Sequence, residues 1–310
     1  MSQRAAIVRG HVNRSRISPA AWRNFRAGLL FGAPAIIGLL AFSIYPILSS
    51  LVDSFTSFDM IRPAKFVGLG NYTTLFTQDS LFWSTLYNTI YYVIFAVPLG
   101  IIVAFLLAML LNQKIRGLSI YRTIFYLPSI TPFVASAVLW VWVFNPQYGL
   151  LNTILAFVGV KGPGWLGDPN WSKPALILMS IWGVGGLMVI FLAGLQGVPS
   201  EQYEAAGIDG ANRWQLLRHV TIPFMGPYFL FGLVAGLIGG FQYFTQVYVM
   251  TQGGPANSTN VYALYLFQNA FSYFKMGYAS AMAWILFLLI AACTALVFRS
   301  SASRVYYGGS

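Results

Sequence analysis

The feature that most constrains this chain is a set of six long apolar runs, none of which contains Asp, Glu, Lys, Arg or His. A run of about 20 apolar residues is long enough to cross the hydrocarbon core of a bilayer as a helix. The runs are uninterrupted, so they lack the alternation of barrel strands, and a helix satisfies its own backbone in lipid. We therefore predict an all-α, polytopic membrane protein with six transmembrane helices. The predicted spans are residues 28–52, 86–111, 123–145, 174–197, 224–250 and 277–298.

Prolines occur inside several of these runs, where a missing backbone N–H and a bulky ring are expected to bend the helix. The positions are Pro34, Pro46, Pro98, Pro128 and Pro132.

Composition supports the membrane assignment, because only 8% of residues are charged and 57% are hydrophobic. Soluble domains carry about 25% charged residues, so this chain could not cover a soluble surface. The 17% of aromatic residues also excludes a disordered chain. A net charge of +11 would suggest a nucleic-acid partner in a soluble protein, but in a membrane protein it indicates orientation.

The basic residues are distributed asymmetrically between the two sides of the predicted helices. Both tails and the second and fourth connections together hold most of the 18 Lys and Arg residues. By the positive-inside rule, both termini are expected in the cytoplasm, and no nucleic acid is needed to explain the charge. We expect a basic cytoplasmic tail at 1–27, a permease domain at 28–299 and a cytoplasmic tail at 300–310. The first tail can also be interpreted as a solvated arm held by anionic lipid.

The sequence lacks the residues needed for ion coupling, nucleotide binding or metal binding. The predicted spans lack the ionisable groups that ion-coupled transporters use, and no phosphate-binding loop motif occurs. Cys293 is the only cysteine, and no His, Cys or carboxylate cluster has metal-ligand spacing. We therefore expect no catalytic residue, metal or cofactor in this chain. Uphill transport would need energy from a partner, and a passive channel or facilitator stays open.

The connection 198–223 carries the most specific pattern. Ser200 can cap a helix whose first turn holds Glu201 and Glu204, the favourable end for acids. Gly210 can end that helix, and a second one is expected over 211–220 with Trp214, Leu217 and Val220 on one side, ended by Pro223. Such a unit is too small to hold a core, so we expect it to dock on another surface.

This connection resembles the coupling loop of ABC importer permeases, whose pattern is E-A-A, three residues, G, nine residues and I-x-L-P. Here Glu204-Ala205-Ala206 is followed by Gly210 and by Val220-Thr221-Ile222-Pro223 at the same spacing, with Val and Ile replacing Ile and Leu. The resemblance implies that the loop inserts into a separate ATPase subunit, which binds ATP and Mg²⁺ and forms a dimer. It also implies the coupling residues Glu204, Ala205, Ala206, Asp209 and Gly210.

Weaker motifs along nearly the whole chain resemble the carbohydrate-uptake branch of these type I importers. Examples are Val67-Gly68-Leu69-Gly70-Asn71-Tyr72, Gly149-Leu150-Leu151-Asn152 and Gly253-Gly254-Pro255. The similarity is greatest to maltose-, lactose- and glycerol-3-phosphate-type permeases. It implies a prokaryotic cytoplasmic-membrane protein that pairs with a second, related permease and receives sugar from an extracytoplasmic solute-binding protein. The implied activity is ATP-driven import by alternating access; the alternatives are an ATP-independent sugar facilitator or channel and, more distantly, a structural assembly protein.

A substrate path can be predicted from polar and aromatic residues at membrane depth, which a water-facing wall tolerates. Gln242 and Gln246 are four residues apart and are expected to share a helix face, and Tyr243 lies between them. Trp182 lies beside several glycines in the fourth span. The two glutamines can also be interpreted as hydrogen-bonding glue between helices, and Trp182 as packing. Gly232, Gly236 and Gly240 form a stripe that we interpret as packing.

The predicted external segments 53–85, 146–173 and 251–276 contain tryptophans with several Pro and Gly residues. They can be interpreted as a landing surface for a binding protein or as an interfacial aromatic belt. Both interpretations stay open.

Overall fold

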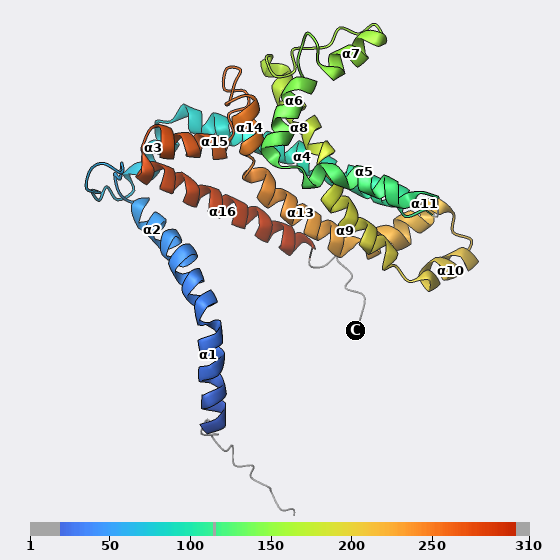
Figure 1. Ribbon diagram of the computed structural model, residues 1–310, viewed down its shortest axis with the longest axis horizontal. Helices are drawn as coiled ribbons and strands as arrows, with labels where there is room; N and C mark the ends of the chain where they lie inside the picture. Colours follow the sequence, from blue (N-terminus) through green and yellow to red (C-terminus); the bar gives the residue numbers. More distant parts are fainter. Residues whose placement is uncertain (1–18, 114–115, 302–310) are drawn as a thin grey trace, which may run out of the picture. The chain divides into compact units, whose positions relative to one another are not determined.

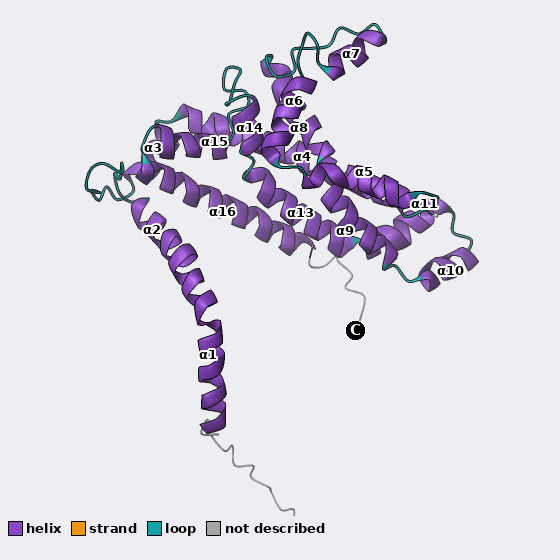
Figure 2. Ribbon diagram, in the orientation of Figure 1, coloured by secondary structure: helices purple, strands orange, loops and turns teal. Residues whose placement is uncertain are grey.

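The computed structural model describes residues 19–113 and 116–301, and these are mostly helical with one isolated β-bridge (Figures 1 and 2). The chain divides into two compact units, residues 1–52 and 53–310. Residues 1–18 of the expected basic tail and 302–310 of the expected C-terminal tail lie outside the described residues.

The first unit is a long helical segment. It comprises α1 (Pro19–Leu39), a π-helical turn (Leu40–Ile44) and α2 (Tyr45–Asp53), which ends at the unit boundary. Helix thus begins before residue 28 and includes Arg23 and Arg26. The most apolar window of residues 22–53 contains no buried residue. Such a helix depends on surroundings outside its own unit to cover its apolar surface.

The second unit is built around α4 (Ser80–Leu111), against which α8 (Pro169–Trp182), α9 (Gly185–Gln196) and α13 (Gly226–Phe241) pack. The helix α16 (Met276–Ser301) packs against α13 (Gly226–Phe241) and α3 (Gly70–Thr77). Four helices in the described residues are long and apolar enough to span a membrane, and two bent helix pairs bring the number to six. The prediction of six spans is therefore confirmed when each bent pair is counted as one span, and three of the spans contain a break.

The third predicted span, 123–145, is two helices that meet at 101°: α5 (Leu118–Ile130) and α6 (Phe133–Val143). The physical reason lies at Thr131, which is extended (φ −72, ψ 132) because the ring of Pro132 disfavours helical geometry in the residue before it. Pro132 therefore ends one helix and precedes the next, instead of only bending a helix.

The fourth predicted span, 174–197, is likewise α8 (Pro169–Trp182) and α9 (Gly185–Gln196), bent by 47°. Its first helix begins five residues earlier than predicted, capped by Asp168, and so includes Lys173. The fifth, 224–250, is α13 followed by α14 (Thr245–Met250), with residues 242–244 between them. The predicted common helix face for Gln242 and Gln246 is therefore wrong.

The glycine stripe of α13 packs against two helices: Gly236 and Gly240 face α4, and Gly232 faces α9. A Cβ added at Gly236 would lie 2.7 Å from Val97 Cγ1, and one at Gly240 would lie 3.0 Å from Val93 Cγ2. Val93 and Val97 belong to a buried cluster that includes Phe241 and Tyr262. The absence of side chains along the stripe thus lets the two backbones approach closely.

The end of this unit that holds α3 and α15 (Tyr262–Phe267) is tied together by Asp79 (Figure 1). Asp79 caps α4 by accepting from the Phe82 N–H at 3.0 Å, and its second oxygen accepts from the hydroxyls of Tyr265, at 2.7 Å, and Tyr278. Burial alone would raise the pKa of Asp79, but these hydrogen bonds outweigh it and lower the pKa below its ordinary value. One carboxylate thereby joins α4, α15 and α16.

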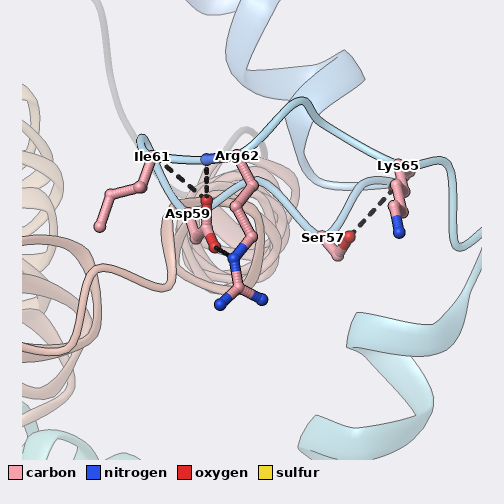
Figure 3. Close-up of polar contacts among 5 residues, drawn as sticks. All are labelled: Ser57, Asp59, Ile61, Arg62 and Lys65. Carbon is pink, nitrogen blue, oxygen red and sulfur yellow. Dashed lines mark hydrogen bonds and ion pairs between the residues drawn. The ribbon is translucent and has the colours of Figure 1, made fainter.

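The segment between α2 and α3 folds on itself through the bridge between Thr56 and Phe66. Figure 3 shows its tip, where Asp59 Oδ1 accepts from the N–H groups of Ile61 (3.1 Å) and Arg62 (2.7 Å). These hydrogen bonds lower the pKa of Asp59, and the bond from the backbone N–H of Arg62 makes the largest contribution. Ile61 and Phe66 are 82% and 80% exposed. This exposed apolar surface is compatible with either interpretation of the external segments.

Candidate functional site

A cavity of about 580 Å³ lies where the helices of the second unit are interrupted. Thr131 between α5 and α6, Gly183 between α8 and α9, and Gln242 to Phe244 between α13 and α14 all line it. Interrupted backbone at membrane depth is tolerated where it lines a cavity or is buried in protein, because its free polar groups need partners. The three breaks that sequence analysis did not foresee therefore share one location.

All four residues predicted for the substrate path line this cavity: Trp182, Gln242, Tyr243 and Gln246. Gln242 follows the last residue of α13 and is exposed, while Gln246 lies in the first turn of α14 and is half-buried. Within residues 19–113 and 116–301, neither glutamine side chain hydrogen-bonds to another residue, so the interhelical bonds considered above are absent from this part of the chain. Both amides are available to a ligand or to a partner chain.

Aromatic rings form two walls of the cavity. Tyr243 stacks on Tyr92 of α4, with ring centroids 4.1 Å apart and an interplanar angle of 15°. Trp182 contacts Trp140 of α6 edge to face, with centroids 6.1 Å apart. Trp182 is half-buried, so it both packs on Trp140 and lines the cavity.

Hydroxyl groups that the sequence analysis did not single out complete the lining. Ser129 donates to Tyr126 O at 2.7 Å, Ser180 to Ile177 O at 2.6 Å and Thr131 to Leu127 O at 3.3 Å. Because the Ser129 and Thr131 protons are donated to carbonyls of α5, the lone pairs of these two hydroxyl oxygens stay available as acceptors, whereas Ser180 also hydrogen-bonds to the Tyr92 side chain. The signal was present in the sequence as isolated hydroxyl residues within apolar runs. The polar residues lining the cavity are Tyr92, Ser129, Thr131, Ser136, Ser180, Gln242, Tyr243, Thr245 and Gln246.

The lining of this cavity contains no charged residue. Within residues 19–113 and 116–301, no three His, Cys, Asp or Glu side chains gather in a way that could hold a metal ion. The cavity is thus a polar, uncharged space with aromatic walls, which can bind a ligand by hydrogen bonds and stacking.

The segment 198–223 lies at the other end of this unit from α3 and α15 (Figure 1). It contains α10 (Ser200–Ile208), α11 (Arg213–Leu216), a π-helical turn (Leu217–Thr221) and the start of α12 (Ile222–Phe224). Gly210, with φ at +80°, lies between the first two helices, where the left-handed conformation favours glycine. The expected helix-turn-helix is present.

Two local details of this segment differ from the predictions. The residue preceding α10 is Pro199, and Ser200 is the first helical residue and makes no capping bond. Pro223 does not end the second helix but lies inside α12, immediately after the π-helical turn. In that wider turn, Ile222 N–H donates to Leu217 O. Proline is tolerated near a helix start, because a backbone N–H at that position would have no carbonyl partner within the helix.

A capping box that the sequence analysis missed starts α11. Asn212 Oδ1 accepts from Gln215 N–H at 2.9 Å, and Gln215 Oε1 accepts from Asn212 N–H at 2.8 Å. The signal, an Asn followed by Gln three residues later, was in the sequence. Tyr203 and Thr221 then join α10 to the π-helical turn by a hydroxyl contact of 3.0 Å. The turn between the helices is therefore well braced.

The predicted coupling residues lie together on the exposed surface of this segment. Glu204, Ala205, Asp209 and Gly210 are exposed and Ala206 is half-buried. Ala206, Asp209 and Gly210 line a depression of about 260 Å³ together with Gln215, His219 and others, whereas Glu204 and Ala205 lie outside it. Ile208 and Trp214 are 88% and 67% exposed, so two large apolar side chains flank the acidic residues.

Comparison with known proteins identifies the group to which this chain belongs. Residues 96–306 match the family described as binding-protein-dependent transport system inner membrane component. The chain is 43% identical over 285 residues to the probable ABC transporter permease protein YesP of Bacillus subtilis, covering 91% of this chain and 92% of YesP. It is 37% identical to the lactose transport system permease protein LacF of Rhizobium radiobacter, covering 89% and 94% of the two chains.

A solved structure has the same fold: that of a bacterial alginate ABC transporter in complex with alginate pentasaccharide-bound periplasmic protein. The alignment has a TM-score of 0.79 and 24% identity and covers 90% of this chain and 96% of the other. The family match, the extended identity to ABC permeases and the shared helical fold agree with one another. This chain belongs to the family of inner-membrane permease components of binding-protein-dependent ABC transport systems.

Proposed function

We propose that this chain is the permease subunit of an ATP-driven sugar importer and forms half of its translocation path by alternating access. The main observation in support is the cavity at which three interrupted spans meet. Hydroxyl, amide and aromatic side chains line it, and none of the lining residues is charged. Sugars offer hydroxyls to such acceptors and donors, and their apolar faces stack on aromatic rings. The lactose permease and the alginate transporter among the similar proteins support a carbohydrate substrate.

In this proposal, Gln242 and Gln246 hydrogen-bond sugar hydroxyls, while Trp182 and the stacked Tyr243 provide apolar walls. Because the described chain makes no bond to either glutamine amide, their partners come from outside it, as substrate, water or the second permease. In this proposal a second, related permease would supply the other half of the path.

The segment 198–223 is proposed to dock into a separate ATPase subunit, which supplies ATP and Mg²⁺, with no nucleotide site in this chain. Glu204 and Asp209 make no ion pair within the described residues, and Ile208 and Trp214 leave apolar surface exposed beside them. Tryptophan and buried charge pairs dominate many interfaces. Glu204, Ala205, Ala206, Asp209 and Gly210 form the proposed contact, with Ile208 and Trp214 added from the structure.

The conformational cycle follows from this attachment. Closure of two ATPase subunits would move both permeases' 198–223 segments, which changes the relative free energies of outward- and inward-open states. An extracytoplasmic binding protein would deliver the sugar, as supported by the periplasmic protein in the alginate transporter complex. Both termini would be cytoplasmic in this arrangement.

Reconstitution tests the proposal against an ATP-independent facilitator. The chain would be purified with its partner subunits, placed in liposomes and assayed for uptake of radiolabelled sugar with binding protein present. We expect uptake only with ATP and with an intact ATPase. Equal uptake by liposomes that contain this chain and the second permease without the ATPase would instead support the facilitator.

A further inference from the structure

A second hollow lies outside the proposed sugar path, on the surface between α4 and α8. It is an apolar groove of about 480 Å³. On α4 its lining runs from Tyr91 to Ile102, and on α8 from Pro174 to Ile181. Several lining side chains are more than half exposed, among them Ile94 at 58% and Phe95 at 51%. A helix surface of this kind in a membrane protein faces either acyl chains or another helix.

One end of the groove carries a fixed cation. Lys173 Nζ lies 5.0 Å from the ring centroid of Tyr87 and 4.9 Å from that of Tyr91, and it donates to Asn88 Oδ1 at 3.1 Å. Asn88 is itself held in place, because its amide donates to the carbonyls of Asn257 and Asn260. The ammonium is therefore positioned by three residues of α4 and does not extend freely into solvent.

The charge of Lys173 is not neutralised inside the described chain. The described residues contain one ion pair, between Asp59 and Arg62, and none involves Lys173. A cation held near apolar surface without a carboxylate attracts an anion from outside, and Asn88 and the tyrosine rings satisfy it only partly. Because Lys173 adjoins Pro174 and contacts Tyr91, both of which line the groove, the charge lies at the groove's end.

The length of the groove fits one leaflet. From Tyr91 to Ile102 the rise along α4 is about 16 Å, close to half of the roughly 30 Å hydrocarbon core. Tyr87, Tyr91 and Lys173 lie toward the N-terminal ends of α4 and α8, where these helices begin outside the apolar region. Tyrosine and lysine are typical of the interfacial layer, in which lipid headgroups reside.

We propose that this groove is a binding site for an anionic phospholipid. One acyl chain lies between α4 and α8, and the phosphate group contacts Lys173. The charge selects an anionic headgroup, and the apolar lining gives affinity for any acyl chain of suitable length. The site is independent of sugar recognition, since no residue of the groove lines the polar cavity.

Native mass spectrometry of the purified complex, with this full chain and its partner subunits, tests the site. Phosphatidylglycerol and phosphatidylcholine with the same acyl chains would be titrated separately. We expect tighter binding of phosphatidylglycerol by about fivefold, since one lysine near an anionic lipid contributes about 1 kcal/mol. Lys173→Met should abolish this preference and Lys173→Arg should preserve it. The matched control, Lys161→Met in an exposed loop, should leave it unchanged.

A second variant tests the acyl-chain site without touching the cation. Leu178→Trp adds bulk to a groove-lining position that is 38% exposed, so it should weaken binding of both lipids while the complex remains assembled. Equal affinity of the wild-type complex for the two lipids would overturn the proposal, as would a preference that survives Lys173→Met. A photoreactive residue at Phe95 that crosslinks a partner subunit instead of lipid would also overturn it.

Discussion

The polar cavity and the segment 198–223 use polar residues in opposite ways. The cavity contains hydroxyls and amides but no charge, and three of its hydroxyls, those of Ser129, Ser180 and Thr131, donate to carbonyls three or four residues earlier in the chain. The segment 198–223 exposes Glu204 and Asp209 beside Ile208 and Trp214. An uncharged wall can hold and release a neutral polar ligand, whereas exposed charge beside exposed apolar surface favours a lasting protein contact. The two regions should therefore fail separately when mutated.

The largest effect is expected at Glu204. Glu204→Lys reverses a charge at the proposed ATPase interface, where loss of a desolvated pair costs about 2–5 kcal/mol, or roughly 30- to 4,000-fold in affinity. Co-purification of the ATPase and its binding affinity in detergent would measure this. Glu201→Lys is a matched control one helical turn earlier, and it should have a much smaller effect. Equal losses in both variants would mean that net charge, not a specific contact, attaches the partner.

Gly185→Ala is expected to deform the cavity wall without weakening ATPase attachment. An added Cβ would lie 2.3 Å from Phe125 O and 2.9 Å from Tyr126 Cα, so backbone of α5 would have to move away from α9. Overpacking costs about 1–3 kcal/mol, and this rigid contact should reach the upper end of that range. Thermal unfolding and sugar uptake would both decline.

The control for that variant is the adjacent glycine. At Gly186 an added Cβ would meet only Ser129 Cβ at 4.0 Å, so Gly186→Ala should fold normally. Comparable destabilisation by the two substitutions would argue against a special role for the contact between Gly185 and α5.

Replacing both Gln242 and Gln246 by Leu should reduce sugar uptake while leaving the complex assembled. Each lost hydrogen bond to substrate is worth about 0.5–1.5 kcal/mol, so the pair gives roughly a 5- to 150-fold lower transport rate. Uptake in liposomes and ATPase co-purification would be measured together. Normal transport kinetics in the double variant would remove these residues from the substrate path.

The smallest expected effect is on thermal stability and concerns Asp79. Its hydrogen-bond partners lie inside this chain, whereas the proposed partner of Glu204 belongs to another subunit. Its pKa is lowered in the folded state, so its contribution to stability is present above the ordinary value of 3.8 and is lost as the pH falls through the lower folded-state pKa. The melting temperature of the wild type should decline over this acidic range more steeply than that of Asp79→Asn.

Sequence reasoning located the membrane spans but not their breaks, and the prolines explain why. Pro98 lies within the continuous helix α4, whereas Pro132 lies at the 101° junction of α5 and α6. The two have the same local chemistry. Val97, before Pro98, is buried against the glycine stripe of α13, while Thr131, before Pro132, lines a cavity where an extended residue is tolerated. Tertiary packing therefore decides between these outcomes.

Some residues of the candidate site could be predicted from the sequence and others could not. Periodicity and residue type were enough to select Trp182, Gln242, Tyr243 and Gln246, which line one cavity, although the helix face expected for the two glutamines does not exist. Tyr92 and Ser180 were not selected, because a single hydroxyl in an apolar span usually bonds to its own helix. Their position beside the breaks is a property of the folded chain.

The segment 198–223 is joined to the helices on both sides of it by very short connections. Only residues 197–199 separate α9 from α10, and on the other side a single turn residue, the fully buried Met225, separates α12 from α13. A docked partner that pulls on α10 and α11 therefore acts on α9 and α13 directly, since no flexible loop can absorb the displacement. Both of these helices adjoin breaks that line the cavity, so in the proposed mechanism a force applied to α10 and α11 would be transmitted to the cavity through these two short connections.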